Sequence, residues 1–330
     1  MNKTRWAIVG TGYIANSFAQ GMQVVEDASL AAVVSRSEAS AKAFAGKYGG
    51  EAVYTDFDAM LSEVKPDVVY LAIPNDLHYA YIMKALDSGA NVLSEKPIVD
   101  NMRQWEAIHA KAGEKGLFLM EGMWTRCFPV VRKVREWIAD GKIGKPLTVD
   151  VCFDIQPDYS DWQTWKAGIA HSGGALRDVG IYSLAVANRV FPDAPKSVSS
   201  TMHSNGEVDD CCHLMLDYGD GRVAFTGGAF NQDSDHVVRI VGSDGSISFG
   251  PEFWHPTEAV LTRNDGDQER FDMPFKATGF EYEIMAVQDA LCKGEKECPF
   301  FTHAESRLIA GLIEDARKSW GIVYRADSEG

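Results

Sequence analysis

The sequence has few features of secreted, membrane-spanning or nucleic-acid-binding proteins. Its six cysteines are unevenly spaced and form neither a C-x-x-C pair nor a zinc-ligand pattern, so they indicate reduced thiols in a reducing compartment. No apolar run approaches the roughly 18–20 residues that span a bilayer. A formal net charge of −15 disfavours binding to nucleic acid and to anionic membrane surfaces, because both attract lysine and arginine.

Other absences narrow the prediction further. The eight histidines lie without metal-ligand spacing, so no metal site is predicted. We expect no targeting segment before the first strand-like run, and the sequence shows no repeats or low-complexity stretches. With 330 residues, of which 45% are hydrophobic and 24% charged, we expect a cytoplasmic globular protein of about two domains.

The first part of the chain alternates short apolar segments with helical patterns. The predicted strands are Arg5–Gly10, Leu30–Ser35, Glu51–Tyr54, Val68–Ile73, Asn91–Ser94 and Leu117–Met120. The predicted helices are Ala15–Val25, Ser37–Tyr48, Phe57–Glu63, Leu77–Ser88 and Met102–Lys115. This alternation predicts an α/β domain with a doubly wound parallel sheet of the Rossmann type, over residues 1–122.

The pattern changes after about residue 120. Residues 123–330 are predicted to form an α+β domain rich in antiparallel strands. Its predicted elements are a strand at Pro146–Ile155, antiparallel strands between residues 195 and 273, and helices at Phe128–Asp140, Ala175–Phe191, Phe280–Lys293 and Ala304–Trp320. Residues 217–221 and 242–245 each close on Asp-Gly, as hairpin turns do.

A glycine-rich loop follows the first predicted strand. The order Gly10, Gly12, Ala15 is a G-x-G-x-x-A pattern between a strand and a helix. Its first glycine permits a tight turn, its second lets the backbone approach a pyrophosphate, and its small third residue lets the helix pack on the strand. We therefore expect dinucleotide binding by the loop residues Gly10, Thr11, Gly12, Tyr13 and Ile14.

The second predicted strand ends at Ser35 and Arg36, where an acidic residue would hold a ribose 2′-hydroxyl. A hydroxyl beside a guanidinium suits a 2′-phosphate, which takes charge-assisted contacts. This pair favours NADP(H) over NAD(H). The alternative is a solvated arginine at the start of a helix.

Two further clusters carry candidate catalytic residues. Glu95-Lys96-Pro97 follows the fifth predicted strand, at the sheet edge where ligands bind, although a surface lysine before a proline is equally ordinary. In the run GGALRDVGIY of residues 173–182, a helix would put Asp178 and Tyr182 on one face. A phenol beside a cation is a credible proton donor or acceptor, while a half-buried tyrosine is the plainer interpretation.

Taken together, these motifs resemble one family. GTGYIA, then PNDLHY at residues 74–79, SEKP at 94–97 and GGALRDVGIY at 173–182 stand in the order found in the glucose–fructose oxidoreductase / inositol dehydrogenase / rhizopine-catabolism (Gfo/Idh/MocA) oxidoreductases. The run DVGIY and the segment MEGMWTRCFP at 120–129 resemble the branch that contains dimeric dihydrodiol dehydrogenase, NADP-dependent D-xylose dehydrogenase and glucose–fructose oxidoreductase. That branch mostly uses NADP(H).

The resemblance implies a hydride transfer coupled to a proton transfer at a hydroxyl or carbonyl oxygen. Tyr182 is the expected acid/base, and Lys96 would lower the pKa of the phenol and bind the nicotinamide ribose. Direct proton donation by Lys96 is the alternative. Asp178 would orient the pair or bind a substrate hydroxyl. The expected substrate is a sugar, a polyol or a trans-dihydrodiol.

The resemblance also implies the surroundings of the site. Further cofactor contacts are expected at Ile73, Asn75, His78 and Glu95, although His78 is as compatible with packing. Trp124 and Phe153 are candidate substrate contacts among the aromatic residues Trp162, Trp165, Trp254 and Phe280, which are also compatible with ordinary packing. Cys127 and Arg177 depart from the usual family residues, so substrate specificity does not carry over.

Three expectations concern the assembly and the kind of function. The second domain is expected to carry a large, mostly antiparallel sheet with one open face, which in this family makes homodimers. The missing N-terminal arm makes permanently bound NADP less expected. The competing functions are a non-redox enzyme that retains its cofactor, such as a redox-assisted glycosidase, and an NAD(P)-sensing regulator.

Overall fold

The computed structural model describes residues 3–157 and 164–328, and the chain divides into two compact units. The first unit contains residues 1–127 and 275–306, and the second contains residues 128–274 and 307–330. The sequence indicated one boundary, after residue 122, and nothing in its pattern indicated that residues 275–306 return to the first unit.

The first unit is built on a six-stranded parallel sheet with the strand order β3-β2-β1-β4-β5-β6. Its strands are β1 (Thr4–Val9), β2 (Ala28–Val34), β3 (Ala52–Tyr54), β4 (Val68–Leu71), β5 (Asn91–Glu95) and β6 (Leu119–Gly122). The order reverses between β1 and β4, which is the topological switch point where such sheets bind ligands. The predicted Rossmann-type sheet is confirmed.

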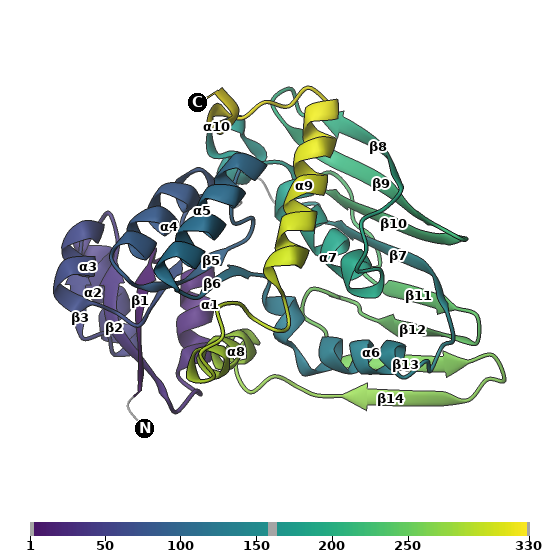
Figure 1. The fold of residues 1–330 in the computed structure, drawn as a ribbon, viewed down its shortest axis with the longest axis horizontal. Coiled ribbons are helices and arrows are strands. Elements are labelled where there is room, and N and C mark those ends of the chain that lie inside the picture. The colour runs from purple at the N-terminus through teal and green to yellow at the C-terminus, as the bar shows by residue number, and fades with distance from the viewer. Residues whose placement is uncertain (1–2, 158–163, 329–330) are drawn as a thin grey trace. The chain divides into compact units, whose positions relative to one another are not determined.

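Helices cover this sheet (Figure 1), and three of them are capped by a side chain of their own sequence. They are α1 (Tyr13–Met22), α2 (Glu38–Tyr48), α3 (Phe57–Val64), α4 (His78–Asp87), α5 (Met102–Lys115) and the late helix α8 (Phe280–Cys292). The side chains of Ser37, Asp56 and Asn101 each accept an N–H group of the first helical turn. Such caps satisfy donors that would otherwise lack a partner.

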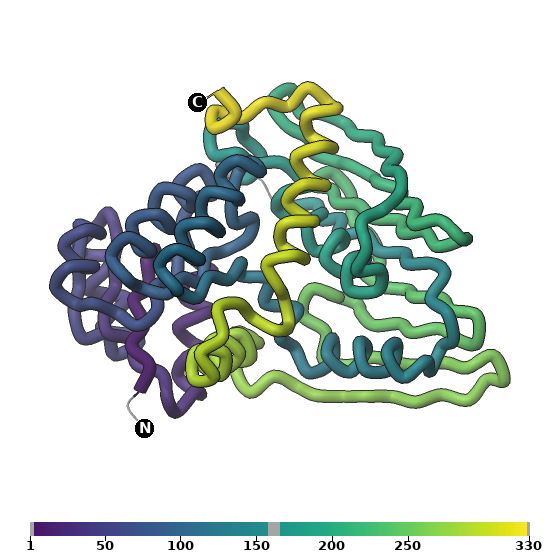
Figure 2. The backbone as a smooth tube through the Cα atoms, in the orientation of Figure 1, coloured from purple at the N-terminus to yellow at the C-terminus, as the bar shows by residue number. Residues whose placement is uncertain are grey.

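The late helix α8 packs against α1, as the tube in Figure 2 shows. Phe18 of α1 stacks on Tyr70 at 3.7 Å between ring centroids and meets the edge of Phe280 at 5.8 Å. All three rings are buried in one apolar core. Aromatic rings of this size contribute a large share of core stability, so the return of α8 is part of the first unit's core.

The second unit is built on an eight-stranded sheet with the order β14-β13-β12-β11-β7-β10-β9-β8. Its strands are β7 (Pro146–Asp154), β8 (Ser197–Ser204), β9 (Asp209–Gly219), β10 (Arg222–Ala229), β11 (Val238–Gly242), β12 (Gly245–Phe249), β13 (Glu258–Arg263) and β14 (Gln268–Asp272). Among the paired strands that the structure describes in this sheet, only β7 and β10 run parallel. The predicted mostly antiparallel sheet is confirmed, with hairpins at both predicted turns.

Helices α6 (Pro129–Ala139) and α7 (Ile181–Val190) lie over one face of this sheet (Figure 1). The chain continues through α9 (His303–Ser319) and the short α10 (Arg325–Ser328). Side chains alternate between the faces of a strand. Met215, Phe225 and Val241 point away from α7 and are 41–45% exposed, so the residues that the structure describes leave this face of the sheet open.

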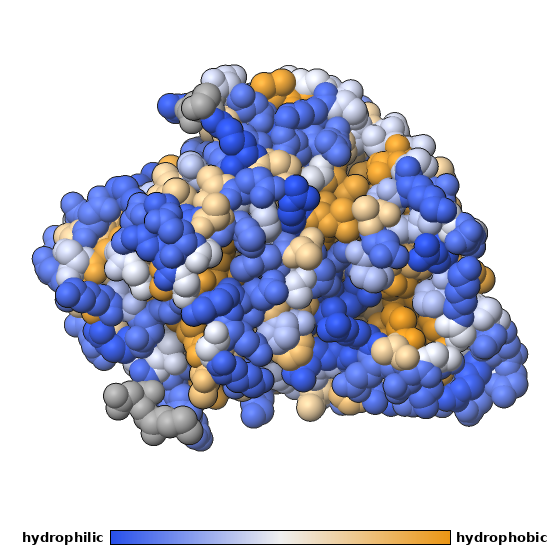
Figure 3. Space-filling view, in the orientation of Figure 1, coloured by the Kyte–Doolittle hydropathy of each residue, from blue (hydrophilic) through white to orange (hydrophobic). Residues whose placement is uncertain are grey.

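The surface agrees with the composition. Hydrophilic residues dominate the face of the molecule shown in Figure 3. Over residues 3–157 and 164–328, no helix combines the length and the apolar character needed to cross a membrane.

Candidate active site

The phosphate loop has the geometry that its glycines predict. Gly10 has a φ of +104°, and a Cβ there would overlap the carbonyl oxygen of Ala72, so only glycine fits. Around Gly12, by contrast, a Cβ would meet no atom within 4 Å. The backbone at Gly12 is therefore open at the N-terminus of α1, where N–H groups attract an anion.

Asn16 holds this loop and was not predicted. Its amide donates to the carbonyls of Thr11 at 3.2 Å and Gly12 at 2.9 Å. Its Oδ1 accepts from the Tyr48 hydroxyl at 3.0 Å and from the Lys47 ammonium at 3.3 Å. The carbonyls of the loop thus point at Asn16, which leaves its N–H groups on the other side. The signal in the sequence that could have indicated this role is a polar residue, Asn16, one helical turn after Gly12.

The ends of β1 and β2 meet beside the loop. The hydroxyls of Thr11 and Ser35 are 3.3 Å apart. Arg36 follows and is exposed, and among the described residues no acidic side chain is found paired with its guanidinium. Ser37 then caps α2 by accepting from the N–H of Ser40. The structure brings the predicted residues 10–14 and 35–36 together at one sheet edge.

The loop after β4 is tied to the loop after β5. His78 is fully buried, with Nε2 2.9 Å from the carbonyl oxygen of Ile73 and Nδ1 2.9 Å from that of Pro97. Asn75 is also buried, in the short turn that leads from β4 to His78. Both ring nitrogens of His78 face backbone carbonyls, one in each loop. The side chain therefore holds the two loops next to each other.

Lys96 is half-buried directly after β5, and several polar contacts fix the chain around it. Glu95 accepts from the Tyr70 hydroxyl at 2.6 Å, and the Lys96–Pro97 peptide bond is cis. Glu121 of β6 accepts from the N–H of Ile98 at 3.0 Å and from the Ser306 hydroxyl at 2.5 Å. This buried carboxylate anchors the chain that leaves Pro97.

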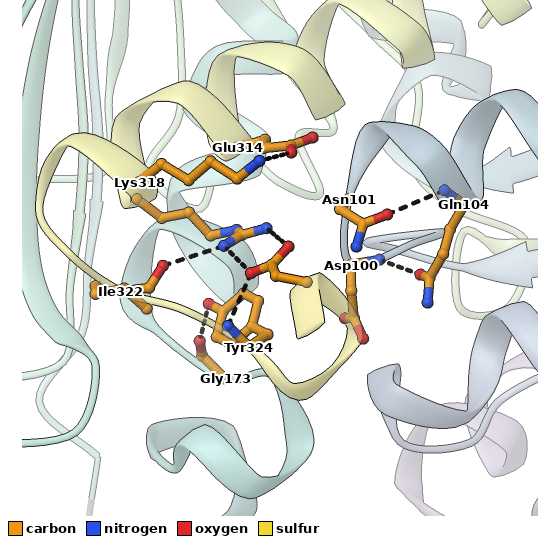
Figure 4. Close-up of polar contacts among 10 residues, drawn as sticks. Asp100, Asn101, Gln104, Gly173, Glu314, Lys318, Ile322 and Tyr324 are labelled. Carbon is orange, nitrogen blue, oxygen red and sulfur yellow. Dashed lines mark hydrogen bonds and ion pairs between the residues drawn. The ribbon is translucent and has the colours of Figure 1, made fainter. Parts of the chain in front are cut away.

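The start of α5 closes this loop, as Figure 4 shows. Asn101 accepts from the N–H of Gln104 at 3.0 Å, and the Gln104 side chain accepts from the N–H of Asp100 at 2.9 Å. This is a reciprocal cap, in which two unpaired donors are satisfied together. The whole stretch from Lys96 to α5 is therefore held by side chains.

The charge of Glu95 acts on a second carboxyl group of the first unit. Glu283 of α8 is fully buried, and neither of its oxygens has a hydrogen-bond partner among the described residues. Burial raises the pKa of Glu283 well above its ordinary value, and the charge of Glu95 raises it further. Both effects favour the uncharged form of Glu283.

Of the predicted aromatic residues, Trp124 and Phe280 belong to the first unit and stack on each other at 4.4 Å. This corrects the expectation that Phe280 lies in the second domain: α8 returns to the first unit's core. Trp162 and the side chain of Trp165 lie outside the described residues. Phe153 and Trp254 belong to the second unit and are described below.

The segment Gly173–Tyr182 departs from the predicted uniform helix. A π-helical turn, Leu176–Gly180, precedes α7. At Gly228 of β10 a Cβ would crowd the backbone of Gly180, and the Ser183 hydroxyl donates to the carbonyl of Gly227 at 2.7 Å. The helix thus lies directly on the backbone of β10, and π-turns of this kind occur often at functional sites.

Asp178 has a partner that was not predicted. The ammonium of Lys166 lies 3.0 Å and 3.2 Å from its two carboxylate oxygens. Both side chains are largely shielded, with exposed fractions of 24% for Lys166 and 13% for Asp178. Shielded charge-assisted bonds are stronger than neutral ones. The two residues are 12 positions apart, in a stretch without regular periodicity, so no sequence signal joined them.

Tyr182 lies beside an aromatic wall. The Phe153 ring of β7 meets the Tyr182 ring edge-on at 5.6 Å and stacks on Trp254 at 3.9 Å with an interplanar angle of 9°. His236 and Phe253 complete the group around Phe153. The structure thus brings three of the singled-out aromatic residues together: Phe153, Tyr182 and Trp254.

The carboxylate of Asp209, on β9, caps the first residue of the π-helical turn. Its Oδ2 accepts from the N–H of Leu176 at 2.6 Å, and a Cβ at Gly174 would overlap its other oxygen. Burial raises the pKa of Asp209 to about 7, against the lowering effects of this hydrogen bond and of the Arg177 charge. Asp209 was not singled out from the sequence.

No cluster of three or more histidine, cysteine or acidic side chains in residues 3–157 and 164–328 is arranged to hold a metal ion.

Comparison with family models agrees with this architecture. Residues 4–123 match the model of an oxidoreductase family with an NAD-binding Rossmann fold, and residues 131–248 match the model of the GFO/IDH/MocA C-terminal domain.

Several full-length relatives are also similar. The chain is 31% identical to trans-1,2-dihydrobenzene-1,2-diol dehydrogenase from Sus scrofa, over 98% of both chains. It is 27% identical to a 3-ketoreductase from Actinomadura kijaniata solved with NADP and TDP-benzene, with a TM-score of 0.83 over 96% of this chain and 98% of that one. Other structures of that enzyme carry a Tyr→Phe or a Lys→Ala substitution. A levoglucosan dehydrogenase solved with NADH, 18% identical over 97% of each chain, shares the fold with a TM-score of 0.86.

Proposed function

Because the chain belongs to the Gfo/Idh/MocA family of NAD(P)-dependent oxidoreductases, we propose that it transfers a hydride between NADP(H) and a CH–OH/C=O group of a sugar, a polyol or a trans-dihydrodiol. The observation that carries this proposal is the arrangement of the second unit. The ring of Tyr182 lies beside an aromatic wall, and the turn before its helix carries Asp178, which is held by the ammonium of Lys166.

In the proposed reaction Tyr182 gives or takes the proton at the substrate oxygen. A phenol has an ordinary pKa near 10, so it needs a nearby cation to work at neutral pH. Lys96 is proposed to supply that charge. Asp178, whose oxygens already bind Lys166, accepts a hydrogen bond from a neighbouring substrate hydroxyl. When bound, the nicotinamide nucleotide supplies or accepts the hydride.

The aromatic wall supports the substrate class. The stacked pair of Phe153 and Trp254 offers a flat apolar surface, and sugars and dihydrodiols both present an apolar ring face beside their hydroxyls. Relatives named as a dihydrodiol dehydrogenase and a 3-ketoreductase handle such groups.

A panel assay with one pair of variants tests the proposal. NADPH absorbance is followed with aldoses, inosose-type ketones and aromatic dihydrodiols. Tyr182→Phe should lower turnover by roughly 10²–10⁴-fold on the best substrate, the usual contribution of general acid–base catalysis, while NADP affinity stays unchanged. Tyr218→Phe removes a hydroxyl from β9 of the same unit, away from the wall, and should keep wild-type turnover. Full activity of Tyr182→Phe would leave Lys96 as the proton donor.

The phosphate loop and Arg36 support NADP(H) over NAD(H). Gly12 is open to a pyrophosphate, and Arg36 is exposed at the end of β2 beside Ser35. Such a guanidinium can bind a 2′-phosphate through two bonds.

Arg36→Asp should therefore weaken NADP binding about 10- to 100-fold, the range expected from a lost charged hydrogen bond. NAD binding should change little, because NAD has no 2′-phosphate. Fluorescence titration with both nucleotides measures this, and equal losses for the two would refute the preference.

We also propose a homodimer formed through the open face of the sheet around Met215, Phe225 and Val241. An apolar surface of this kind is usually covered by a partner, and sedimentation at several concentrations tests it. The six cysteines are sparse and lack the spacing of a disulfide framework, and we propose a reducing location, the cytoplasm.

A further inference from the structure

The residues after α9 fold back on themselves in the second unit. The buried guanidinium of Arg317 holds the carboxylate of Asp327 with two bonds of 2.7 Å and 2.8 Å, and it donates to the carbonyl of Ile322 at 3.1 Å. Asp327 also accepts from the N–H of Tyr324 at 2.9 Å. Residues 322–328, here called the C-terminal hook, are therefore fixed by a bidentate ion pair, which adds geometric precision to charge.

Tyr324 joins the C-terminal hook to an earlier part of the second unit, since it contacts Gly173 and Arg177. Its ring is buried between two guanidinium groups, with Arg317 at 4.5 Å and Arg177 at 5.0 Å from the ring centroid. Its hydroxyl donates to the carbonyl of Gly173 at 2.6 Å, as Figure 4 shows. Arg177, one of the residues that depart from the family pattern, thus has a packing partner 147 positions away in the chain.

Gly173 begins the turn that leads to the candidate catalytic residues. Its N–H donates to the carbonyl of Gly168, and the next N–H, of Gly174, donates to the carbonyl of Lys166 at 2.8 Å. Gly174 in turn accepts from the N–H of Asp178 at 3.0 Å. A shift of Gly173 would therefore move both members of the Lys166–Asp178 ion pair.

We propose that Tyr324 is a positioning residue, which through the Gly173 carbonyl sets the place of Asp178 and Tyr182. This inference rests on the proposed function of those two side chains. Reactions of this kind are sensitive to small displacements, and a misplacement near 1 Å can cost about 100-fold in rate. The C-terminal hook itself touches no reacting atom in this proposal.

The test compares Tyr324→Phe with Trp320→Phe. The first removes one hydroxyl and keeps the ring between the two arginines. The second removes one hydrogen bond from the same stretch, in which Trp320 donates to the hydroxyl of Ser200 on β8 at 3.1 Å. Tyr324→Phe should lower kcat about 10- to 100-fold, move the pH profile of kcat, and leave NADP affinity unchanged. Trp320→Phe should keep the wild-type kcat and pH profile.

Asp327→Asn is the second variant, in case Tyr324→Phe does not fold. It loosens the C-terminal hook while the Tyr324 hydroxyl stays in place, so kcat should fall less, with the same movement of the pH profile. Unchanged kcat and pH profile in both variants, with Tyr182→Phe inactive, would overturn the positioning role alone. Full activity of Tyr182→Phe would overturn the role of Tyr182, and with it this inference, and would leave Lys96 as the proton donor of the proposed function.

Discussion

Two glycine-containing segments of this molecule, residues 10–15 and residues 173–182, are shaped in different ways. The first contains a bond of its own, from Asn16 to the carbonyl of Gly12 four positions away, beside contacts with Ser35 and Tyr48 that span 24 and 32 positions. The second is held from afar, because Lys166, Asp209 and Tyr324 bind it from 12, 33 and 151 positions away.

The difference explains what each glycine does. Gly12 stands in open space, so the protein itself does not require it, and its smallness serves something that approaches the backbone. Gly174 lies against Asp209 with a φ of +129°, so the folded chain requires it. A motif that serves a ligand can be recognised locally, whereas a segment shaped by distant contacts cannot.

The largest effect is expected from Gly174→Ala. An added Cβ would combine a φ open essentially to glycine with an overlap on the Asp209 carboxylate. The free energy of unfolding should fall by about 3–5 kcal/mol, from backbone strain and overpacking together. Gly206→Ala is the matched control, since Gly206 has a φ of +103° and no atom near its Cβ position. Urea denaturation measures both, and equal losses would mean that Asp209 does not constrain the turn.

Much of the fold was predictable because its causes are local. All six strands of the first unit end within two residues of their predicted bounds, and α5 matches its predicted range. Buried parallel strands are apolar throughout, and helices such as α2 and α5 carry their caps in sequence. Both Asp-Gly hairpin turns of the second sheet are also present.

The candidate site was predictable in its residue types and less so in its geometry. Asp178 and Tyr182 were named, but the π-helical turn that contains Asp178 packs closely on Gly228, which lies on a strand about 50 positions later in the chain. The ion pair of Asp178 with Lys166 has no periodic signal. The return of α8 to the first unit depends on the fit of Phe280 against Phe18, which composition does not specify.

A second prediction concerns pH. The pKa of Asp209 is about 7 in the folded chain, above its unfolded value near 3.9, so the folded state binds the proton more tightly. The contribution of Asp209 to stability is then largest at low pH and falls as the pH rises toward 7, by about 2–3 kcal/mol between pH 5 and 7. Asp209→Asn stays neutral and keeps an oxygen for the Leu176 N–H. Its stability relative to wild type should therefore increase over that window in denaturation curves, and parallel curves would contradict the argument.

The smallest effect on stability is expected from Gly12→Ala, which completes the comparison with Gly174. Gly12 has a φ of −75°, open to any residue, and no atom lies near its Cβ position. The free energy of unfolding should change by less than about 0.5 kcal/mol. NADP affinity should nevertheless fall about 10- to 100-fold, because a methyl group would stand where the pyrophosphate meets the backbone.

The same substitution at Gly10 is its control, since there the chain itself lacks room, and stability should fall as well. If Gly12→Ala instead stayed folded and bound NADP normally, the open backbone at Gly12 would not be the binding site of the pyrophosphate. The two glycine-containing segments would then differ in packing alone.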